Sequence, residues 1–388
     1  MKPKSKAPTP ELPPLALYIH IPWCVKKCPY CDFNSHTSNV IPEQAYIEAL
    51  LEDLRQDAHF AQGRSISTIF FGGGTPSIFS ANAIADILKG VEAIVPIAQG
   101  AEITLEANPG TFEQEKFNGF YDAGINRLSI GIQSFNDSKL KALGRIHGSE
   151  EALRAVAVAK AAGFNNINLD LMFGLPNQTL EDALQDLQTA IKLEPTHLSW
   201  YQLTIEPNTI FYTKTPVLPE DDEIWTIQEQ GQQLLQSHGF SQYEISAYAT
   251  PGKQCAHNLN YWQFGDYLAI GAGAHGKSTC LESGAIKRWR KTRLPKDYLD
   301  NTKAYTSELN TLLENDAIFE FFLNGLRLNQ GVDLNQFESR TSASLASIQA
   351  PINTAIDKGL MTLLNDQAIP TAQGLRYLND LQGIFLPD

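Results

Sequence analysis

Short apolar runs alternate with amphipathic stretches along the first half of the chain. Six runs have the length of a strand and end in polar or glycine-rich turns: 15–21, 67–71, 102–106, 127–132, 166–173 and 197–204. Between them, apolar residues recur at helical spacing in 42–60, 81–94, 112–123, 150–162 and 180–193. This alternation predicts an α/β fold with parallel strands, which we expect to form a partial (βα)6 TIM-like barrel.

The pattern changes after residue 204. Residues 221–237 have the spacing of one more helix, and the segments 317–328, 334–346 and 352–360 are apolar at helical spacing. These segments predict a smaller, mostly helical C-terminal domain. We therefore divide the chain into a polar tail (1–14), the barrel (15–240), a barrel-flanking segment (241–293) and a C-terminal domain (294–388).

The composition favours a soluble chain with large cores. Of the 388 residues, 43% are hydrophobic, and no stretch approaches the roughly 18 uninterrupted apolar residues of a membrane helix. The first 14 residues are polar and proline-rich and lack the apolar core of a signal peptide. We therefore expect a cytoplasmic protein, in which cysteines stay reduced.

The charge argues against nucleic-acid binding. The formal net charge is -13, whereas binding to phosphates is driven by positive charge. One local exception is the segment 287–293, which places five cations around Trp289. It is either a solvated basic face or a docking place for the carboxylates of a ligand or for an anionic surface.

Three of the five cysteines lie within eight residues, on the predicted loop after the first strand. Their spacing is Cys24-x3-Cys28-x2-Cys31. Three neighbouring thiolates repel one another unless a positive centre holds them. Structural zinc needs four ligands, and His20 or His36 could supply the fourth. A 4Fe-4S cluster held by three cysteines instead leaves one iron open for a substrate or cofactor.

A glycine turn follows one βα unit later. Residues 72–76 read Gly-Gly-Gly-Thr-Pro, directly after the second predicted strand. Together with the cysteine loop, in which Tyr30 precedes the last cysteine, this turn resembles the radical S-adenosylmethionine (SAM) superfamily. The resemblance implies that the three cysteines hold a 4Fe-4S cluster and that SAM chelates the open iron. It also implies that Tyr30, Gly73, Gly74 and Thr75 contact SAM.

Within that superfamily, most of the chain resembles the coproporphyrinogen III dehydrogenase group. Further SAM contacts are implied at positions on or near successive strands: Tyr18, Glu106, Gln133, Arg145 and Asp170. Their chemistry suits the cofactor. A carboxylate such as Asp170 accepts hydrogen bonds from ribose hydroxyls, and a guanidinium such as Arg145 pairs with a carboxylate in fork geometry. Glu106 is expected to hold the ammonium or to orient Arg145.

Two departures from the dehydrogenase pattern favour the heme-chaperone branch of this group. The dehydrogenases carry a further cysteine two residues after the third ligand, where this chain has Phe33, and only 23 residues precede Cys24. Residues 257–262 match the His-Asn-x-x-Tyr-Trp signature of HemW-type chaperones.

The signature also suggests where heme would bind. Imidazole is the commonest axial ligand of heme iron, so His257 is the first candidate heme ligand, with His275 and Cys255 as second choices. Tyr261 and Trp262 would lie against the porphyrin. The basic segment 287–293 would receive the heme propionates.

The main hypothesis is therefore a heme chaperone that carries a 4Fe-4S cluster and SAM and passes heme to acceptor hemoproteins. The first alternative is a radical SAM oxidoreductase acting on a porphyrinogen, in which reductive cleavage of SAM yields a hydrogen-abstracting radical. The second is a zinc-stabilised scaffold. An electron donor, a peripheral membrane contact and a homodimer are left open as further partners, and nucleic acid is not expected.

Overall fold

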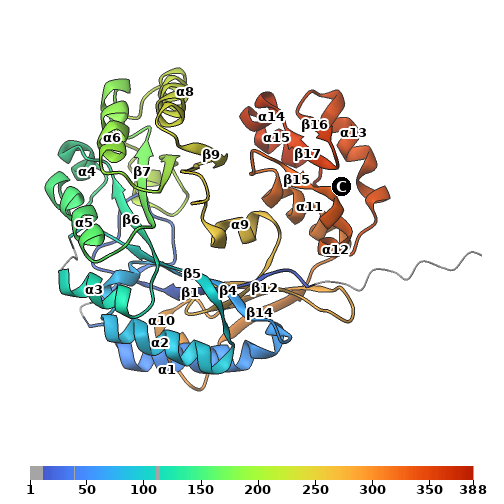
Figure 1. Cartoon of the computed structure of the whole chain (residues 1–388), viewed down its shortest axis with the longest axis horizontal. Coiled ribbons are helices and arrows are strands. Elements are labelled where there is room, and N and C mark those ends of the chain that lie inside the picture. Colours follow the sequence, from blue (N-terminus) through green and yellow to red (C-terminus); the bar gives the residue numbers. More distant parts are fainter. Residues whose placement is uncertain (1–11, 39, 111–113, 388) are drawn as a thin grey trace, which may run out of the picture.

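A single twelve-stranded sheet organises most of the molecule. The computed structural model describes residues 12–38, 40–110 and 114–387, and Figure 1 shows the whole chain. The strand order is β14-β13-β12-β11-β1-β4-β5-β6-β7-β8-β10-β9, with two free ends, so the barrel is open. The predicted tail lies outside the described residues except for 12–14, as do the first two residues of the predicted helix 112–123.

The six predicted strands form the parallel centre of this sheet. They are β1 (Leu15–Ile21), β4 (Ile66–Gly73), β5 (Ile97–Ala107), β6 (Arg127–Gln133), β7 (Ile167–Phe173) and β8 (His197–Gln202). Every neighbouring pair among them is parallel. All seven residues of β6 are buried, as expected for a strand covered on both faces. The predicted partial (βα)6 barrel is confirmed.

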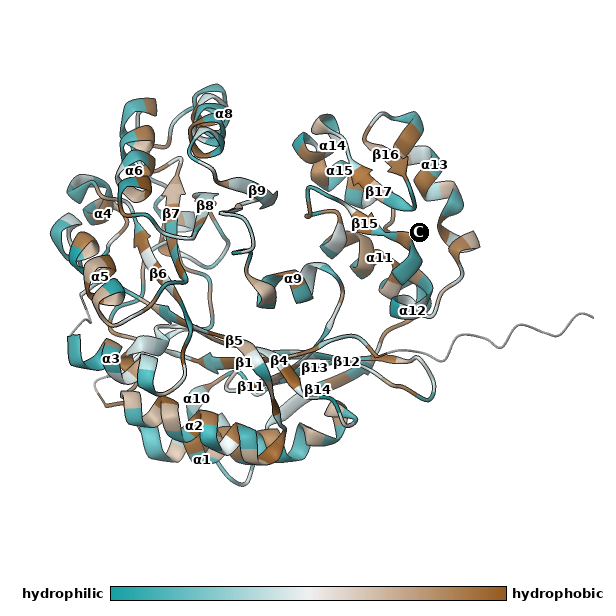
Figure 2. Ribbon diagram, viewed as in Figure 1, coloured by the Kyte–Doolittle hydropathy of each residue, from teal (hydrophilic) through white to brown (hydrophobic). Residues whose placement is uncertain are grey.

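Helices connect these strands and cover the outer face. They are α1 (Glu43–Asp57), α2 (Ala81–Ile94), α3 (Gln114–Asp122), α4 (Asp137–Ala142), α5 (Ser149–Ala161), α6 (Leu180–Lys192), α7 (Ile210–Thr213) and α8 (Asp221–Ser237). Figure 2 shows brown and teal positions alternating along the long outer helices, as amphipathic helices require. The main core lies between these helices and the strands.

Flanking segments extend the sheet at both ends. The hairpin β9 (Ser241–Glu244) and β10 (Ala247–Ala249) pairs with β8, and β11 (Asp266–Ile270) lies parallel to β1. Three antiparallel strands follow: β12 (His275–Thr279), β13 (Ile286–Lys291) and β14 (Thr306–Thr311). The short helix α10 (Pro295–Tyr298) joins the last two strands.

β14 falls within the segment 294–388 that was predicted to belong to the C-terminal domain. Its sequence, Thr-Ser-Glu-Leu-Asn-Thr, is mostly polar and exposed, so hydrophobic alternation could not reveal it as a strand of the large sheet.

The C-terminal unit is built around a second core. Its helices are α11 (Glu314–Gly325), α12 (Phe337–Thr341), α13 (Gln349–Asp357), α14 (Ala372–Arg376) and α15 (Leu378–Gly383). They surround a small sheet in the order β15 (Val332–Asp333), β17 (Gln367–Pro370), β16 (Met361–Leu364). Phe322 and Phe385 stack at its centre with ring centroids 3.8 Å apart. Phe264 and Ile286 join this core from the sheet side, so the two units share packing.

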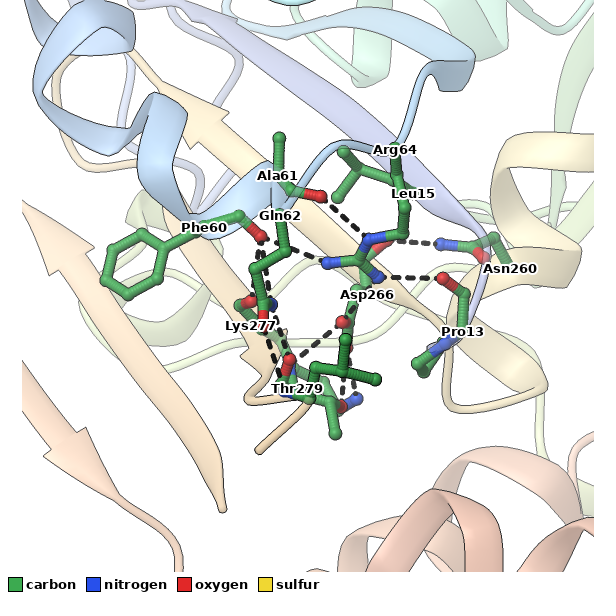
Figure 3. Close-up of polar contacts among 12 residues, drawn as sticks. Pro13, Leu15, Phe60, Ala61, Gln62, Arg64, Asn260, Asp266, Lys277 and Thr279 are labelled. Atoms are coloured by element: carbon green, nitrogen blue, oxygen red, sulfur yellow. Dashed lines mark hydrogen bonds and ion pairs between the residues drawn. The ribbon is translucent and has the colours of Figure 1, made fainter. Parts of the chain in front are cut away.

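One buried carboxylate fixes the turn between α9 (Ala256–Trp262) and β11. Figure 3 shows Asp266 at the centre of a polar network. Its oxygens accept hydrogen bonds from Lys277 Nζ at 3.0 Å, from Arg64 Nη1 at 2.8 Å and from Thr279 N at 2.8 Å. Burial alone would raise the pKa of Asp266, but these partners, Lys277 foremost, hold it below its usual value. The helix α9 contacts both β4 and α11 (Figure 1), so it lies between the two units. The network around Asp266 fixes the turn that follows this helix.

Candidate functional site

The cysteine loop is closed at its base by a two-stranded ladder. β2 (Trp23–Cys24) pairs in parallel with β3 (His36–Thr37), and the loop between them carries the other two cysteines. Within the loop, Cys31 N donates to Cys28 O at 3.2 Å, and Lys27 Nζ donates to Phe33 O at 3.0 Å. The loop thus holds all three thiols at the carboxyl end of β1.

Two polar side chains approach the cysteine sulfurs. Thr75 Oγ1 lies 3.5 Å from Cys24 Sγ, and Arg145 Nη1 lies 3.6 Å from Cys28 Sγ. Burial raises the pKa of the Cys24 and Cys31 thiols. A positive centre would be needed to hold them as thiolates, which is the condition under which cysteines bind metals.

The described residues show no group arranged to hold a single metal ion. In the part of the chain that the structure describes, no three His, Cys, Asp or Glu side chains meet where a single metal ion would sit. A zinc ion draws each thiolate to about 2.3 Å, whereas the cysteines of an iron-sulfur cluster bind different irons. The three cysteines are therefore compatible with a cluster, in which each would bind a different iron.

The glycine turn is packed directly onto the backbone that leads to the cysteines. Gly74 N donates to Ile21 O at 2.7 Å, and Thr75 N donates to Trp23 O at 2.8 Å. A Cβ on Gly74 would lie 2.4 Å from Trp23 O, and Gly73 has a φ of +112°. Only glycine permits both the approach and the backbone conformation.

Most of the residues predicted to bind the cluster or SAM line one cavity of about 540 Å³. They come from the cysteine loop and the ends of β4 to β7: Cys24, Cys28, Tyr30, Cys31, Gly73, Gly74, Thr75, Glu106, Gln133, Arg145 and Asp170. We call this space the cysteine cavity. Its volume lies within the roughly 300–1,000 Å³ of small-molecule sites.

Glu106 on β5 contacts the glycine turn and lies near Asp170 of β7. Its Oε2 accepts a hydrogen bond from Gly73 N at 3.2 Å. Burial, and after it the nearby Asp170, raise the pKa of Glu106 to about 8. A cation bound beside Glu106 would therefore favour the ionised form of its carboxyl group.

Arg145 is held by acceptors other than Glu106. Its Nη2 donates to Asn108 Oδ1 at 2.7 Å and to Gly131 O at 2.8 Å. Asn108 also donates from Nδ2 to Thr75 Oγ1 at 3.0 Å. Of the two roles expected for Glu106, orienting Arg145 is thus taken by Asn108, which also connects the arginine to the glycine turn.

Gln133 ends β6, and Asp170 lies in the middle of the neighbouring strand β7; side chains of the sheet hold both residues. Gln133 has a φ of +70°, and its Oε1 accepts a hydrogen bond from Tyr201 Oη at 2.8 Å. Asp170 accepts from Ser129 Oγ at 3.1 Å and from Asn168 Nδ2 at 2.8 Å. Burial raises the pKa of Asp170, which these hydrogen bonds partly counteract.

Some of these supporting residues were not predicted from the sequence. Asn108 lies in an Asn-Pro-Gly turn at the end of the third predicted strand, which is a signal for a polar strand-end residue. Tyr201 and Ser129 point into the cavity from strand interiors, where only the strand register determines which way a side chain faces.

A second cavity of about 550 Å³ adjoins the first. Six of the residues that line it are aromatic: Tyr18, Phe33, Tyr261, Trp262, Phe264 and Tyr267. We call it the aromatic cavity. Phe33, Gly73 and Glu106 line both cavities and form their common wall.

Tyr18 differs from the other predicted SAM contacts, because it lines the aromatic cavity and not the cysteine cavity. Its hydroxyl lies 3.0 Å from His20 Nδ1, and its ring stacks on Phe70 with centroids 6.4 Å apart. Its position next to Glu106 keeps it beside the common wall.

The structure does not bring His257 into either cavity. The side chain is 1% exposed, Nδ1 bonds to Thr68 Oγ1 at 2.9 Å, and Nε2 bonds to Tyr261 Oη at 2.8 Å. Burial lowers the pKa of His257 to about 3. With both ring nitrogens engaged, His257 positions Tyr261, and it could bind iron only after breaking one of these bonds.

The other residues of the His-Asn-x-x-Tyr-Trp segment support the same wall. Asn260 Nδ2 donates to Asp266 O at 2.9 Å, and the Arg327 guanidinium lies 4.3 Å from the Trp262 ring centroid. Tyr261 and Trp262 line the aromatic cavity, as expected for residues that would face a ligand. Cys255 is fully buried beside Glu102.

The basic segment 287–293 is divided between two faces of β13. Lys291 is buried against Asp53 and Asp57 at 2.5 and 2.6 Å. Arg290 is exposed and pairs with Glu308 at 2.6 Å. Arg288 alone from this segment lines the aromatic cavity. Only one of the five predicted cations is therefore placed to meet a ligand there.

Comparison with known proteins agrees with this geometry. Residues 18–190 match the family model of the radical SAM superfamily, and residues 312–377 match that of the HemN C-terminal domain. A solved structure of coproporphyrinogen III oxidase (HemN) from Escherichia coli, a radical SAM enzyme, has a TM-score of 0.80 at 24% identity. The alignment covers 96% of this chain and 90% of that one. At this identity the likeness establishes the fold.

Curated relatives match over almost the full length. The heme chaperone HemW of Haemophilus influenzae is 53% identical over 98% of this chain and 100% of its own. The heme chaperone HemW of Escherichia coli is 52% identical over 97% of this chain and 100% of its own. The present chain belongs to the HemW family of the radical SAM superfamily.

Proposed function

We propose that this chain is a heme chaperone that binds heme and transfers it to acceptor hemoproteins in the cytoplasm, with a 4Fe-4S cluster and SAM as cofactors. The observation that carries the proposal is the pair of adjoining cavities. One is lined by three cysteines and the predicted SAM contacts, and the other is lined by aromatic side chains. A flat, largely apolar macrocycle suits the second, while the cofactors suit the first.

Cys24, Cys28 and Cys31 would hold the cluster. They line one cavity, and the remaining two cysteines lie elsewhere. The hydrogen bonds from Thr75 and Arg145 would stabilise two of the thiolates once the cluster is bound. When bound, the cluster supplies an iron without a protein ligand, to which SAM can attach.

SAM would occupy the rest of the cysteine cavity. Glu106 would pair with the ammonium group, and Arg145, held by Asn108, would face the carboxylate. Gln133 and Asp170 would accept or donate hydrogen bonds at the ribose. The turn at Gly73 and Gly74 lets the backbone approach the methionyl group.

The alternative function is an oxidoreductase that acts on a porphyrinogen. Phe33 argues against it. This residue stands where the dehydrogenase pattern has a cysteine, it is 63% exposed, and its side chain lines both cavities. An apolar ring at this position offers contact area to a macrocycle and no thiol chemistry.

The test uses the full chain, reconstituted anaerobically with iron and sulfide. Heme is titrated by absorbance, and the loaded protein is mixed with an apo-hemoprotein to follow transfer of the heme spectrum. Cys24→Ser, Cys28→Ser and Cys31→Ser are expected to lose the cluster absorbance, while Cys280→Ser serves as the matched control. Failure of the full chain to bind heme, or robust decarboxylation of coproporphyrinogen III with SAM and a reductant, would refute the proposal. An electron donor, a membrane contact and a homodimer remain predictions.

A further inference from the structure

We propose that His275 is the axial ligand of heme bound in the aromatic cavity, and that Arg288 pairs with a heme propionate. This inference rests on the proposed heme-binding function and assigns its site. His275 begins β12, is exposed, and lines the aromatic cavity. Among the described hydrogen bonds and ion pairs, its ring takes part in none, so its nitrogens are available to a metal.

The other histidines do not meet these conditions. All eight lie in the described part of the chain, and only His20 and His275 line either cavity. His20 Nδ1 is engaged with Tyr18 Oη at 3.0 Å, and Nε2 lies 2.9 Å from Asn34 O. Both ring nitrogens of His20 are therefore engaged, whereas the His275 imidazole lines the cavity with no hydrogen-bond partner among the described residues.

The surroundings of His275 keep the imidazole in the form that binds iron. A metal takes the neutral ring, and protons compete with it. Partial burial lowers the pKa of His275, and the charges of Arg288 and Arg290 lower it further, with Glu308 opposing. This shift favours the neutral imidazole, which is the form that binds a metal.

Arg288 lies on the neighbouring strand and supplies positive charge to the same cavity. Its Nη1 donates to Tyr267 Oη, and its Nε lies 3.5 Å from Glu320 Oε2. A guanidinium has five donors in a planar fork, so it can keep these contacts and still bind a carboxylate. Heme has an iron that accepts an imidazole and a propionate edge that accepts an arginine, which fits the two residues in one cavity.

The aromatic walls match the remaining surface of heme. The rings of Tyr261 and Tyr267 meet edge to face with centroids 4.5 Å apart, and Lys277 lies 4.1 Å from the centroid of the Phe264 ring. These contacts and the His257 hydrogen bond hold the wall in place before a ligand arrives. A preformed wall lowers the ordering cost of binding.

The decisive experiment is spectroscopic and uses the reconstituted full chain. His275→Gly is expected to weaken heme binding at least about tenfold and to remove the absorbance and electron paramagnetic resonance signature of imidazole-ligated ferric heme. Added imidazole is expected to restore that signature, which a structural role could not explain. His238→Ala, at the exposed end of α8, is the matched control and should leave both unchanged.

The arginine is tested separately. Arg288→Gln is expected to weaken heme binding by about three- to tenfold and to reduce its dependence on salt. Lys287→Gln removes a neighbouring charge on the opposite face of β13 and should change neither. Equal effects of both substitutions would overturn the role of Arg288.

The outcomes separate this inference from the proposed function. If the unaltered chain fails to bind heme, the proposed function falls and the site falls with it. If it binds heme and His275→Gly keeps the same spectrum and affinity, the function stands and the ligand assignment is refuted. Restoration of the signature by added imidazole in His257→Gly, but not in His275→Gly, would equally refute His275.

Discussion

Gly73 N donates a hydrogen bond to Glu106 Oε2 at 3.2 Å, which joins the glycine turn after β4 to the end of β5. Both residues lie on the wall shared by the cysteine cavity and the aromatic cavity. The glycine turn and the strand end that carries Glu106 are separate motifs in the sequence, and this hydrogen bond joins them into one structural unit. Several measurable properties depend on it.

SAM binding should release a proton from Glu106. In the free protein the pKa of this carboxyl is about 8, because of burial and then Asp170, so it is protonated at pH 7. An ammonium group at Glu106 favours the ionised form, so affinity should rise with pH up to about 8, by at most about tenfold per unit for one proton. Calorimetry in buffers of different ionisation enthalpy measures the release. The Glu106→Gln variant should bind SAM more weakly and release no proton from residue 106. The same proton release in both proteins would contradict the assignment of Glu106 as the group that releases it.

Gly74→Ala should abolish SAM binding and impair cluster assembly. The added methyl group would lie 2.4 Å from Trp23 O, on the backbone that leads into the cysteine loop. Backbone cannot yield as a flexible side chain can, so the turn or the loop must move. Gly383→Ala, which has open space around the new methyl group, is the control. Normal cluster absorbance and SAM affinity in Gly74→Ala would show that the contact is unimportant.

Asn108→Ala should weaken SAM binding about tenfold while leaving the cluster in place. The change removes the acceptor of Arg145 Nη2 and the donor to Thr75 Oγ1, and a hydrogen bond to a charged group contributes about 1.5–3 kcal/mol. Equilibrium dialysis with labelled SAM measures the affinity. Asn118→Ala, on the exposed side of α3, should have no effect.

Asp266→Asn should destabilise the fold by about 3–5 kcal/mol, because it leaves Lys277 buried without its counter-charge. Denaturant unfolding at pH 7 measures the change. Asp297→Asn breaks an exposed pair with Lys303 and should change stability by less than about 1 kcal/mol. The pKa of Asp266 is depressed in the fold, so its contribution is present above its unfolded pKa and is lost as the pH falls through the folded value. Equal stabilities of the two variants would rule out this role for the network.

The sequence predicted the elements better than their spatial relations. Short apolar runs located the central strands and period-3.6 patterns located the helices between them. The turns after the strands pointed to one side of the sheet, where Glu106 and Asp170 line the cysteine cavity. His257 shows the limit. Nothing in its local sequence indicates that Thr68, 189 positions away, occupies its Nδ1. Such contacts depend on strand register and tilt, which one-dimensional periodicity does not contain.

The same limit applies to charge. The segment 287–293 has the composition of a basic patch, yet alternation along β13 buries Lys291 against Asp53 and Asp57 and turns Arg288 towards the aromatic cavity. That Cys24, Cys28 and Cys31 lie together at one strand end could be predicted, because residues on one short loop need no long-range contact to be neighbours.

The common wall of Phe33, Gly73 and Glu106 has a thermodynamic consequence. A ligand in one cavity that moves the common wall also changes the lining of the other cavity. Binding in one cavity can therefore change the affinity of the other. Whatever factor SAM imposes on the heme affinity of this chain, heme must impose the same factor on its SAM affinity. The two binding constants of the doubly loaded protein are therefore not independent quantities, and measuring one coupling fixes its counterpart.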